Sequence, residues 1–273
     1  MPTSSNELSN NPLNNAEVTE PVRDAASVIL VRTAPEGQTG LQAFMLRRAG
    51  STTVMNDAYV FPGGKVDPED GQPDTLQRYK VPADAAAAIN EPGLTGTMAG
   101  ALFAAACREC HEECGVNLTA EHLIPFSRWI TPKTPAMMRR RFDTRFFVAC
   151  LPEGASAVHD GVEADTSEWM SPQAAIDAYC SGQITLAPPQ IMTLAVLHHF
   201  KDFTALRTHL QGHQAPLIEP FPFKDDTGAR SIAYPGDPVH PVQMAAFPGP
   251  SRLVWRGDHF EPPEGPAAYF KGA

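Results

Sequence analysis

Long apolar runs are absent from this sequence. No stretch approaches the roughly 18–20 consecutive apolar residues that a membrane-spanning helix needs. The first twenty residues are rich in Asn, Ser and Glu and contain no apolar core, which is not typical of a secretion signal. We therefore expect a disordered segment over residues 1–20, and a cytoplasmic protein that makes no contact with a membrane.

Positive charge is also in short supply. The chain has 21 Lys and Arg against 31 Asp and Glu, and its formal net charge is −10. An acidic protein has no general attraction for the phosphate backbone of a nucleic acid, which argues against binding to such a polymer. A small anionic substrate would need a local basic patch or a metal ion to offset this charge.

Cysteine is scarce, and its number is odd. Three of the five cysteines, Cys107, Cys110 and Cys114, lie within one short segment, which argues against a disulfide framework. With His111 they resemble zinc-ligand spacing. On a helix, however, they would form one stripe, and a single helix rarely surrounds a tetrahedral metal site. We therefore expect these thiols to pack in the core as small apolar groups.

Apolar periodicity predicts a chain of short strands and helices. We expect strands at residues 25–32, 41–48, 59–61, 126–131, 142–151 and 168–170, and helices at 98–114, 172–180 and 188–210. This order predicts an α+β fold in which a mixed β-sheet packs between helices, an α/β/α sandwich.

Two segments do not follow this pattern. Residues 67–96 are rich in Pro, Asp, Gly and Ala, with a short helix candidate at 84–89, and are interpreted as an insertion. Residues 216–273 are dense in proline and aromatic residues, with one strand candidate at 252–255. We therefore expect one main domain over residues 21–210 and a helical or irregular C-terminal extension over 211–273 that packs on it.

Three carboxylates gather in the segment from Arg108 to Val116. Glu109 lies on one helix face with Glu112 and Glu113, its i+3 and i+4 neighbours. Like charges this close repel, and a hard divalent cation held by carboxylate oxygens would relieve the repulsion. Arg108 lies four residues before Glu112, within reach of an ion pair. The alternative is a solvated acidic patch.

The same segment resembles the Nudix superfamily, whose signature runs from a glycine and a glutamate to an Arg-Glu and a Glu-Glu pair. Gly64 matches the first glycine, Asp70 stands where the family has Glu, and 37 residues separate Asp70 from Arg108, where the family has seven. The second half matches at Arg108, Glu109, Cys110, Glu112, Glu113, Gly115 and Val116. An insertion over about residues 71–97 inside this signature resembles the subgroup of the mammalian peroxisomal coenzyme A diphosphatase and its bacterial relatives. The flanking segments 44–48, 129–132 and 141–147 also fit that subgroup.

The resemblance implies a Nudix fold and a metal-dependent diphosphatase. By it, Glu112 and Glu113 ligate Mg²⁺ or Mn²⁺, Glu109 is a further ligand and catalytic group, and Gly64 offers its carbonyl oxygen. Arg108 would hold the carboxylates in register. The metal would polarise the phosphoryl oxygens and activate a bound water.

The general base has two candidates. Family members use either a glutamate of the signature or a carboxylate from a later loop, and here Glu163 and Glu168 are available. The alternative for each is an ordinary loop acid.

Basic residues suggest where an anionic substrate binds. Arg47, Arg48 or Lys65 would contact phosphates, but Arg47 and Arg48 alternate along a strand, so one of them should face the site. Arg141 and Arg145, in a second basic cluster with residues 139 and 140, could receive a group such as the 3′-phosphate of coenzyme A. The alternative is a solvated loop that balances nearby acids.

These expectations define one principal function and two kinds of alternative. The principal one is hydrolysis of the diphosphate linkage of a small nucleotide substrate, coenzyme A or acyl-coenzyme A. The alternatives are ADP-ribose, NADH or a dinucleotide as substrate, or a Nudix domain that binds a ligand without catalysis. A homodimer is consistent with the family, since many members dimerise.

Overall fold

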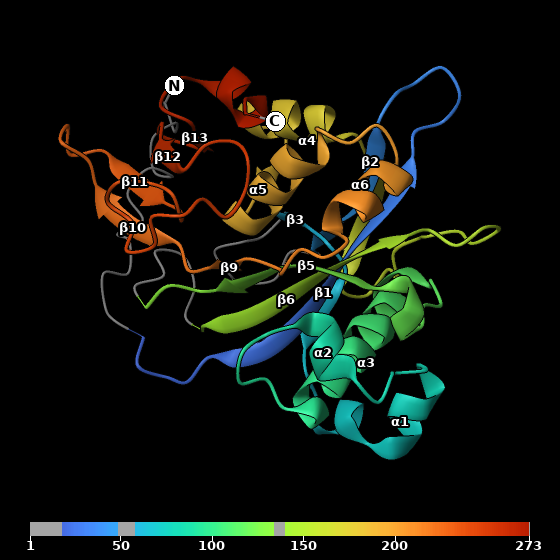
Figure 1. Cartoon of the computed structure of the whole chain (residues 1–273). Helices are drawn as coiled ribbons and strands as arrows, with labels where there is room; N and C mark the ends of the chain where they lie inside the picture. The colour runs from blue at the N-terminus through green and yellow to red at the C-terminus, as the bar shows by residue number, and fades with distance from the viewer. Residues whose placement is uncertain (1–17, 49–57, 134–139, 273) are drawn as a thin grey trace, which may run out of the picture.

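A mixed β-sheet forms the centre of the molecule. The computed structural model describes residues 18–48, 58–133 and 140–272 (Figure 1). Within them, nine strands form one sheet in the order β8-β3-β2-β1-β6-β5-β9, with β4 paired to β1 and β7 paired to β2. The bounds are β1 (Arg23–Thr33), β2 (Leu41–Arg48), β3 (Ala58–Val60), β4 (Gly63–Lys65), β5 (Ile124–Ile130), β6 (Phe142–Cys150), β7 (Ala164–Met170), β8 (Thr185–Leu186) and β9 (Leu217–Ile218).

Strand β1 is central because it is apolar on both faces. It pairs in parallel with β6 along residues 23–31, and a strand covered on both sides reads as a continuous apolar run. Ile29 and Val31 belong to one buried cluster, and Val28 and Leu30 belong to the other. The sheet therefore separates two cores, one on each face.

Helices cover both faces, which confirms the expected sandwich. On one side lies α3 (Gly96–Cys114), with α1 (Pro73–Arg78) and α2 (Ala85–Ile89). On the other side lie α4 (Pro172–Cys180), α5 (Pro188–Leu197) and α6 (Phe203–Leu210) (Figure 1). No helix in the part of the chain that the structure describes is both long and apolar enough to cross a membrane.

Helix α3 has well-defined ends. The Thr95 hydroxyl accepts a hydrogen bond from the Met98 N–H at 3.2 Å, which caps the first turn. Gly115 ends the helix in the left-handed conformation, with φ 71°. The expected helix over 98–114 is thus confirmed and is slightly longer.

The expected helix over 188–210 is two helices. Residues 198–202 separate α5 from α6, because the Asp202 carboxylate accepts the Ala205 N–H at 2.8 Å and starts a new helix. Apolar periodicity runs across both helices and hides the break.

The segment between β4 and α3 contains short helices. The expected helix at 84–89 corresponds to α2, whereas the 3₁₀ turn η1 (Pro68–Gly71) and α1 were not anticipated. A further turn, η2 (Ala120–His122), follows α3. The residues from η1 to α2 pack along α3, where Leu76 lies against Gly100.

The C-terminal segment holds a second sheet rather than helical or irregular chain. It comprises β10 (Phe221–Lys224), β11 (Arg230–Ala233), β12 (Arg252–Trp255) and β13 (Phe260–Glu261), followed by the turn η3 (Pro266–Phe270). Of these strands, β12 coincides with the predicted strand. The others have at most four residues, too few for alternation to be visible. Of the segment expected to be disordered, residues 1–17 lie outside the described residues.

Candidate active site

Arg108 is the centre of the polar cluster on α3. Its Nε and Nη2 atoms donate to the two carboxylate oxygens of Asp70 at 2.8 and 2.9 Å. Its Nη1 donates to Glu109 at 2.9 Å and to Glu112 at 3.0 Å. Nη2 also donates to the Lys65 carbonyl oxygen at 3.2 Å. One guanidinium therefore joins the acidic helix to β4 and η1.

Asp70 is the anchor of this arrangement. Its side chain is fully buried, and it also accepts the Asp67 N–H at 2.8 Å. A two-point contact between arginine and carboxylate fixes both partners in orientation. Although aspartate is shorter than the glutamate of the family signature, it orients Arg108 directly.

The double glycine of β4 lies against the acidic helix. The Gly63 N–H donates to Glu113 Oε2 at 2.8 Å. A Cβ atom on Gly64 would overlap the Glu109 carboxylate, so a side chain cannot be placed there without displacing Glu109. The long interruption in the sequence therefore leaves the two halves of the signature adjacent in space.

The ionised forms of Glu109 and Glu113 are disfavoured, because both side chains are largely buried beside other acids. Burial raises the pKa of Glu113 to about 8, against the hydrogen bond from Gly63, and the charges of Glu109 and Glu163 raise it further. Burial also raises the pKa of Glu109, which Arg108 opposes and Glu112 and Glu163 reinforce. Additional cationic charge would stabilise the ionised forms of both groups.

The donor set has the chemistry of a hard-cation site. Magnesium and manganese prefer carboxylate and carbonyl oxygens, which Glu109, Glu112, Glu113 and Gly64 supply. Across the described ranges, however, no three His, Cys, Asp or Glu side chains are arranged to hold a metal ion. In this arrangement the Arg108 guanidinium supplies the counter-charge to Glu109 and Glu112. These residues have the oxygen donors and the negative charge that a divalent ion needs, but their side chains do not converge around one point.

The structure distinguishes the two candidate bases. The charge of Glu163 contributes to the raised pKa of both Glu109 and Glu113, so its exposed carboxylate lies near the cluster. Glu168 pairs with Met45, whose side chain belongs to the core on the opposite face of the sheet from α3. There it accepts a hydrogen bond from the Tyr59 hydroxyl at 3.4 Å. This geometry argues against Glu168 as a base at the acidic site.

Arg47 and Arg48 point to opposite faces of the sheet, although the strand register shifts between them. Arg48 lies two residues after Leu46, which packs on the α3 side of the sheet. The positive charge of Arg48 lowers the pKa of Glu113. Arg47 forms an ion pair with Asp165 at 2.7 Å. Lys65 is exposed and pairs with Asp67 at 2.6 Å. Of the two arginines, Arg48 is the one placed beside the acidic cluster.

Arg145 is a buried structural residue. It is 6% exposed and pairs with Glu91 at 2.7 Å, with Asp143 at 3.2 Å and with Asp24. A guanidinium enclosed by carboxylates cannot also receive a substrate phosphate, which argues against the expected substrate contact.

Arg141 bonds to the Thr131 carbonyl oxygen at 2.9 Å and to Glu219 at 3.3 Å. Sequence reasoning missed Glu91, because nothing in the sequence relates it to an arginine 54 residues away.

The buried thiols of α3 lie on its core side. Cys107, Cys110 and Cys114 are buried in the apolar cluster between α3 and the sheet, which confirms the expected packing. Burial raises the pKa of Cys107 to about 12. The cysteine stripe and the glutamate stripe therefore occupy different sides of one helix.

Comparison with known proteins places this arrangement in a family. Residues 100–197 match the NUDT19 Nudix domain. An acyl-coenzyme A diphosphatase NUDT19 of Xenopus laevis is 34% identical over 105 residues, which are 38% of this chain and 27% of the frog protein. The matched region thus spans about a quarter of that relative. A putative nudix hydrolase 7 of Caenorhabditis elegans is 28% identical over 236 residues, covering 81% of this chain and 75% of the worm protein.

The fold has a counterpart among solved structures. The crystal structure of a Nudix hydrolase from Alicyclobacillus acidocaldarius superposes with a TM-score of 0.55 at 19% identity, covering 71% of this chain and 97% of that one. The sandwich around the sheet is therefore a known fold. The fold, the interrupted signature and the sequence relatives together support a Nudix hydrolase that resembles the coenzyme A diphosphatases.

Proposed function

We propose that this protein hydrolyses the diphosphate linkage of coenzyme A or an acyl-coenzyme A ester with Mg²⁺ or Mn²⁺. The observation that carries the proposal is the contact across the interrupted signature, where Gly63 and Gly64 meet Glu113 and Glu109. The Xenopus laevis relative called acyl-coenzyme A diphosphatase supports the choice of substrate.

Each residue of the cluster has a proposed task. Glu109, Glu112 and Glu113, with the Gly64 carbonyl oxygen, would hold the ion, which supplies Lewis acidity and lowers the pKa of a bound water. Arg108 orients Glu109 and Glu112 through its own attachment to Asp70.

Residues around the cluster would act on the substrate. Glu163 would accept the proton of the attacking water, since its carboxylate is exposed and near the acids. Arg48, beside Glu113, and the exposed Lys65 would bind phosphate oxygens. Water attack on one phosphorus would break the diphosphate linkage, giving a phosphopantetheine fragment and an adenosine bisphosphate.

Glu112→Gln tests the metal assignment. Glu112 is exposed, so the substitution should leave the unfolding temperature within about 1 °C while turnover falls at least about 100-fold, the scale of a lost electrostatic contact at a reacting phosphoryl group. The matched control is Glu153→Gln, an exposed glutamate shortly after the end of β6. Wild-type turnover in Glu112→Gln would refute the assignment.

A substrate panel separates the alternatives. Coenzyme A, acyl-coenzyme A, ADP-ribose, NADH and a diadenosine polyphosphate are incubated with the protein and each metal in turn. We expect the coenzyme A compounds to give the highest kcat/KM. Preference for another compound would support diphosphate hydrolysis but refute coenzyme A as the substrate. Saturable binding of a compound without product would indicate a ligand-binding domain.

A further inference from the structure

A large groove lies at the edge of the main sheet, where β5 pairs with β9. Its volume is about 1020 Å³, at the upper end of the range for small-molecule pockets. Its walls come from residues 89–92 after α2, from β5 and β6, and from residues 209–222 and 240–248 of the C-terminal segment. The Gln214 side chain bonds to the Asn90 carbonyl oxygen at 2.9 Å and joins two of these walls. The groove is therefore built by the inserted and C-terminal segments against the sheet.

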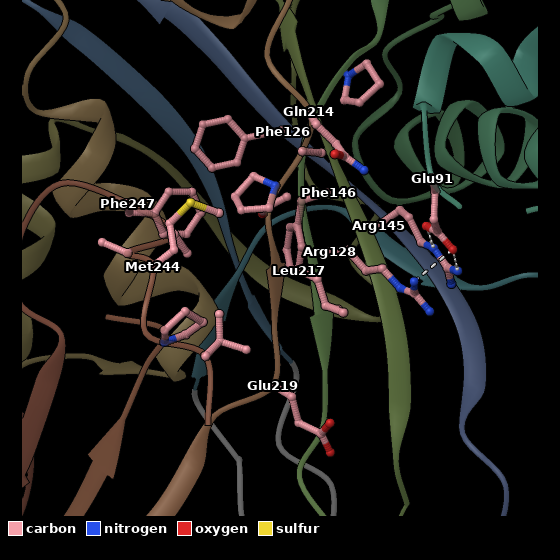
Figure 2. Close-up of a pocket in the computed structure, with 18 of the residues that line it drawn as sticks. Glu91, Phe126, Arg128, Arg145, Phe146, Gln214, Leu217, Glu219, Met244 and Phe247 are labelled. Carbon is pink, nitrogen blue, oxygen red and sulfur yellow. Dashed lines mark hydrogen bonds and ion pairs between the residues drawn. The ribbon is translucent and has the colours of Figure 1, made fainter. Parts of the chain in front are cut away.

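One side of the groove is apolar and open. Met244, Leu217 and Val242 line it with 80%, 50% and 49% of their surface exposed. Behind them the rings of Phe126 and Phe247 stack with centroids 5.8 Å apart. Figure 2 shows Met244, Phe126 and Phe247 gathered on this side. Exposed apolar side chains concentrated in one hollow indicate a site for an apolar ligand.

The opposite end of the groove is polar, but its charges are already paired. Glu91 binds Arg145 at 2.7 Å and Arg128 at 2.9 Å, and Figure 2 shows the three side chains directed toward one another. Arg128 also binds Asp143 at 2.6 Å. This end therefore gives little attraction to an anion, and the ligand that suits the groove is an uncharged apolar chain.

The polar end is close to the acidic cluster along the sheet. Arg145 of β6 pairs with Ala26 of β1, and Ala26 pairs with Gly64 of β4. Neighbouring strands lie about 4.8 Å apart, so the backbones of Arg145 and Gly64 are separated by roughly 10 Å. The groove thus begins within reach of a substrate whose diphosphate lies beside Gly64.

We propose that the groove binds the acyl chain of an acyl-coenzyme A substrate. The inference rests on the proposed function, which puts the diphosphate at the acidic cluster. The pantetheine arm, comparable to about four extended residues, spans roughly 14 Å and carries the thioester past Arg145 to the apolar side of the groove. Each methylene removed from water there should strengthen binding by about fourfold.

Chain-length dependence of kcat/KM is the primary test. Coenzyme A and its butanoyl, octanoyl and decanoyl esters are compared at concentrations below micelle formation. For the wild type we expect kcat/KM to rise from butanoyl to decanoyl. In Met244→Asp and Leu217→Asp, which put a charge in the apolar wall, kcat/KM for decanoyl-coenzyme A should fall at least about tenfold. The value for coenzyme A itself should stay within about twofold.

Val239→Asp is the matched control. Val239 is an equally apolar residue of the same segment, 43% exposed, and it is not among the residues that line the groove. This variant should retain the wild-type chain-length profile. A flat wild-type profile, or equal losses on coenzyme A and decanoyl-coenzyme A in Met244→Asp, would overturn the inference.

A binding measurement keeps this inference separate from the proposed function. Dansylundecanoic acid, a fluorescent fatty acid, is titrated into the full chain and displaced with decanoyl-coenzyme A. Binding that is weakened by Met244→Asp but not by Val239→Asp supports the groove even if no compound is hydrolysed. No binding of the probe, or a dimer in light scattering that Met244→Asp converts to monomer without changing acyl selectivity, would overturn it. The second result would make the groove an interface between two copies.

Discussion

At residue 108, one side chain carries the organisation of the site. The guanidinium binds a fully buried carboxylate on one side and two glutamates of its own helix on the other. Arginine suits this position because its planar fork donates in several directions while its charge persists at every physiological pH. Lysine could not replace these contacts, since it has one donor atom. The orientation of Glu109 and Glu112 therefore depends on how firmly Asp70 holds Arg108.

Asp70→Asn should destabilise the fold. Removing one partner of a buried ion pair costs about 3–5 kcal/mol, and the partial exposure of Arg108 places this case near 3 kcal/mol. Urea denaturation would measure the change in unfolding free energy, with an unchanged slope showing that two-state behaviour is kept. The control is Asp74→Asn, at the exposed first turn of α1. Equal stability of Asp70→Asn and the wild type would show that Asp70 does not anchor Arg108.

Gly64→Ala should disable the site without unfolding the protein. The new Cβ would occupy the position of the Glu109 carboxylate, a flexible group that can move away. We therefore expect Mn²⁺ affinity, measured by calorimetry, to fall at least about tenfold, the scale seen when the surroundings of a metal site are disturbed. Gly96→Ala is the control, because its Cβ would meet nothing within 4 Å. Unchanged Mn²⁺ affinity in Gly64→Ala would show that Glu109 does not ligate the metal.

At the scale of elements, helix α3 has an acidic side and a side with buried cysteines. Its glutamates face β4 and solvent, while its cysteines pack on the sheet. The periodicity of a helix makes this division visible in the sequence, since residues 107, 110 and 114 form one stripe and residues 109, 112 and 113 another. The same regularity made the central strands and α4 predictable, because each buries a periodic apolar face.

Native thiol reactivity tests the packing of α3. Burial raises the pKa of Cys107 to about 12. The hydrogen bond with Cys114, together with burial, raises the pKa of Cys110 well above its usual value. The thiolate is the reactive form, so these cysteines should resist Ellman's reagent at pH 8 in the native protein. All five cysteines should react once urea unfolds the chain. Rapid native labelling at these positions, or zinc retained after dialysis, would contradict core packing.

Other elements could not be predicted from apolar periodicity, because they depend on a single cap, on very short strands or on tertiary pairing. The break between α5 and α6 depends on one capping aspartate, and the strands of the second sheet are too short for alternation to show. Glu168 was a reasonable candidate base in the sequence, but its pairing with Met45 turns it to the other face of the sheet. The nearness of Gly64 to Glu109 was predicted because the family signature implies it. The catalytic roles of these residues stay predictions.

At the scale of the whole molecule, charged and polar side chains tie the segments outside the main sheet to it. Glu91, in the segment between β4 and α3, binds both Arg128 of β5 and Arg145 of β6. The second tie is the hydrogen bond from Gln214 to Asn90. These contacts connect the inserted segment, the sheet and the C-terminal segment at the place where the groove opens. The groove's shape therefore depends on these polar contacts as well as on apolar packing such as that of Phe126 with Phe247.

Glu91→Gln should loosen this junction while sparing the acidic cluster. The amide keeps the size of the side chain but removes the charge shared by two guanidinium groups, one of them 6% exposed. Arg145 would keep Asp24 and Asp143, and Arg128 would keep Asp143, so the loss should be smaller than for an isolated buried pair, about 2 kcal/mol. Hydrogen exchange should quicken over residues 85–92 and 212–217, whereas exchange in the middle of α3 should stay at the wild-type rate. Because the glutamates of α3 do not contact Glu91, turnover of coenzyme A should persist as selectivity for long acyl esters declines. If exchange quickens throughout α3 and both substrates lose turnover together, Glu91 supports the whole domain rather than its groove.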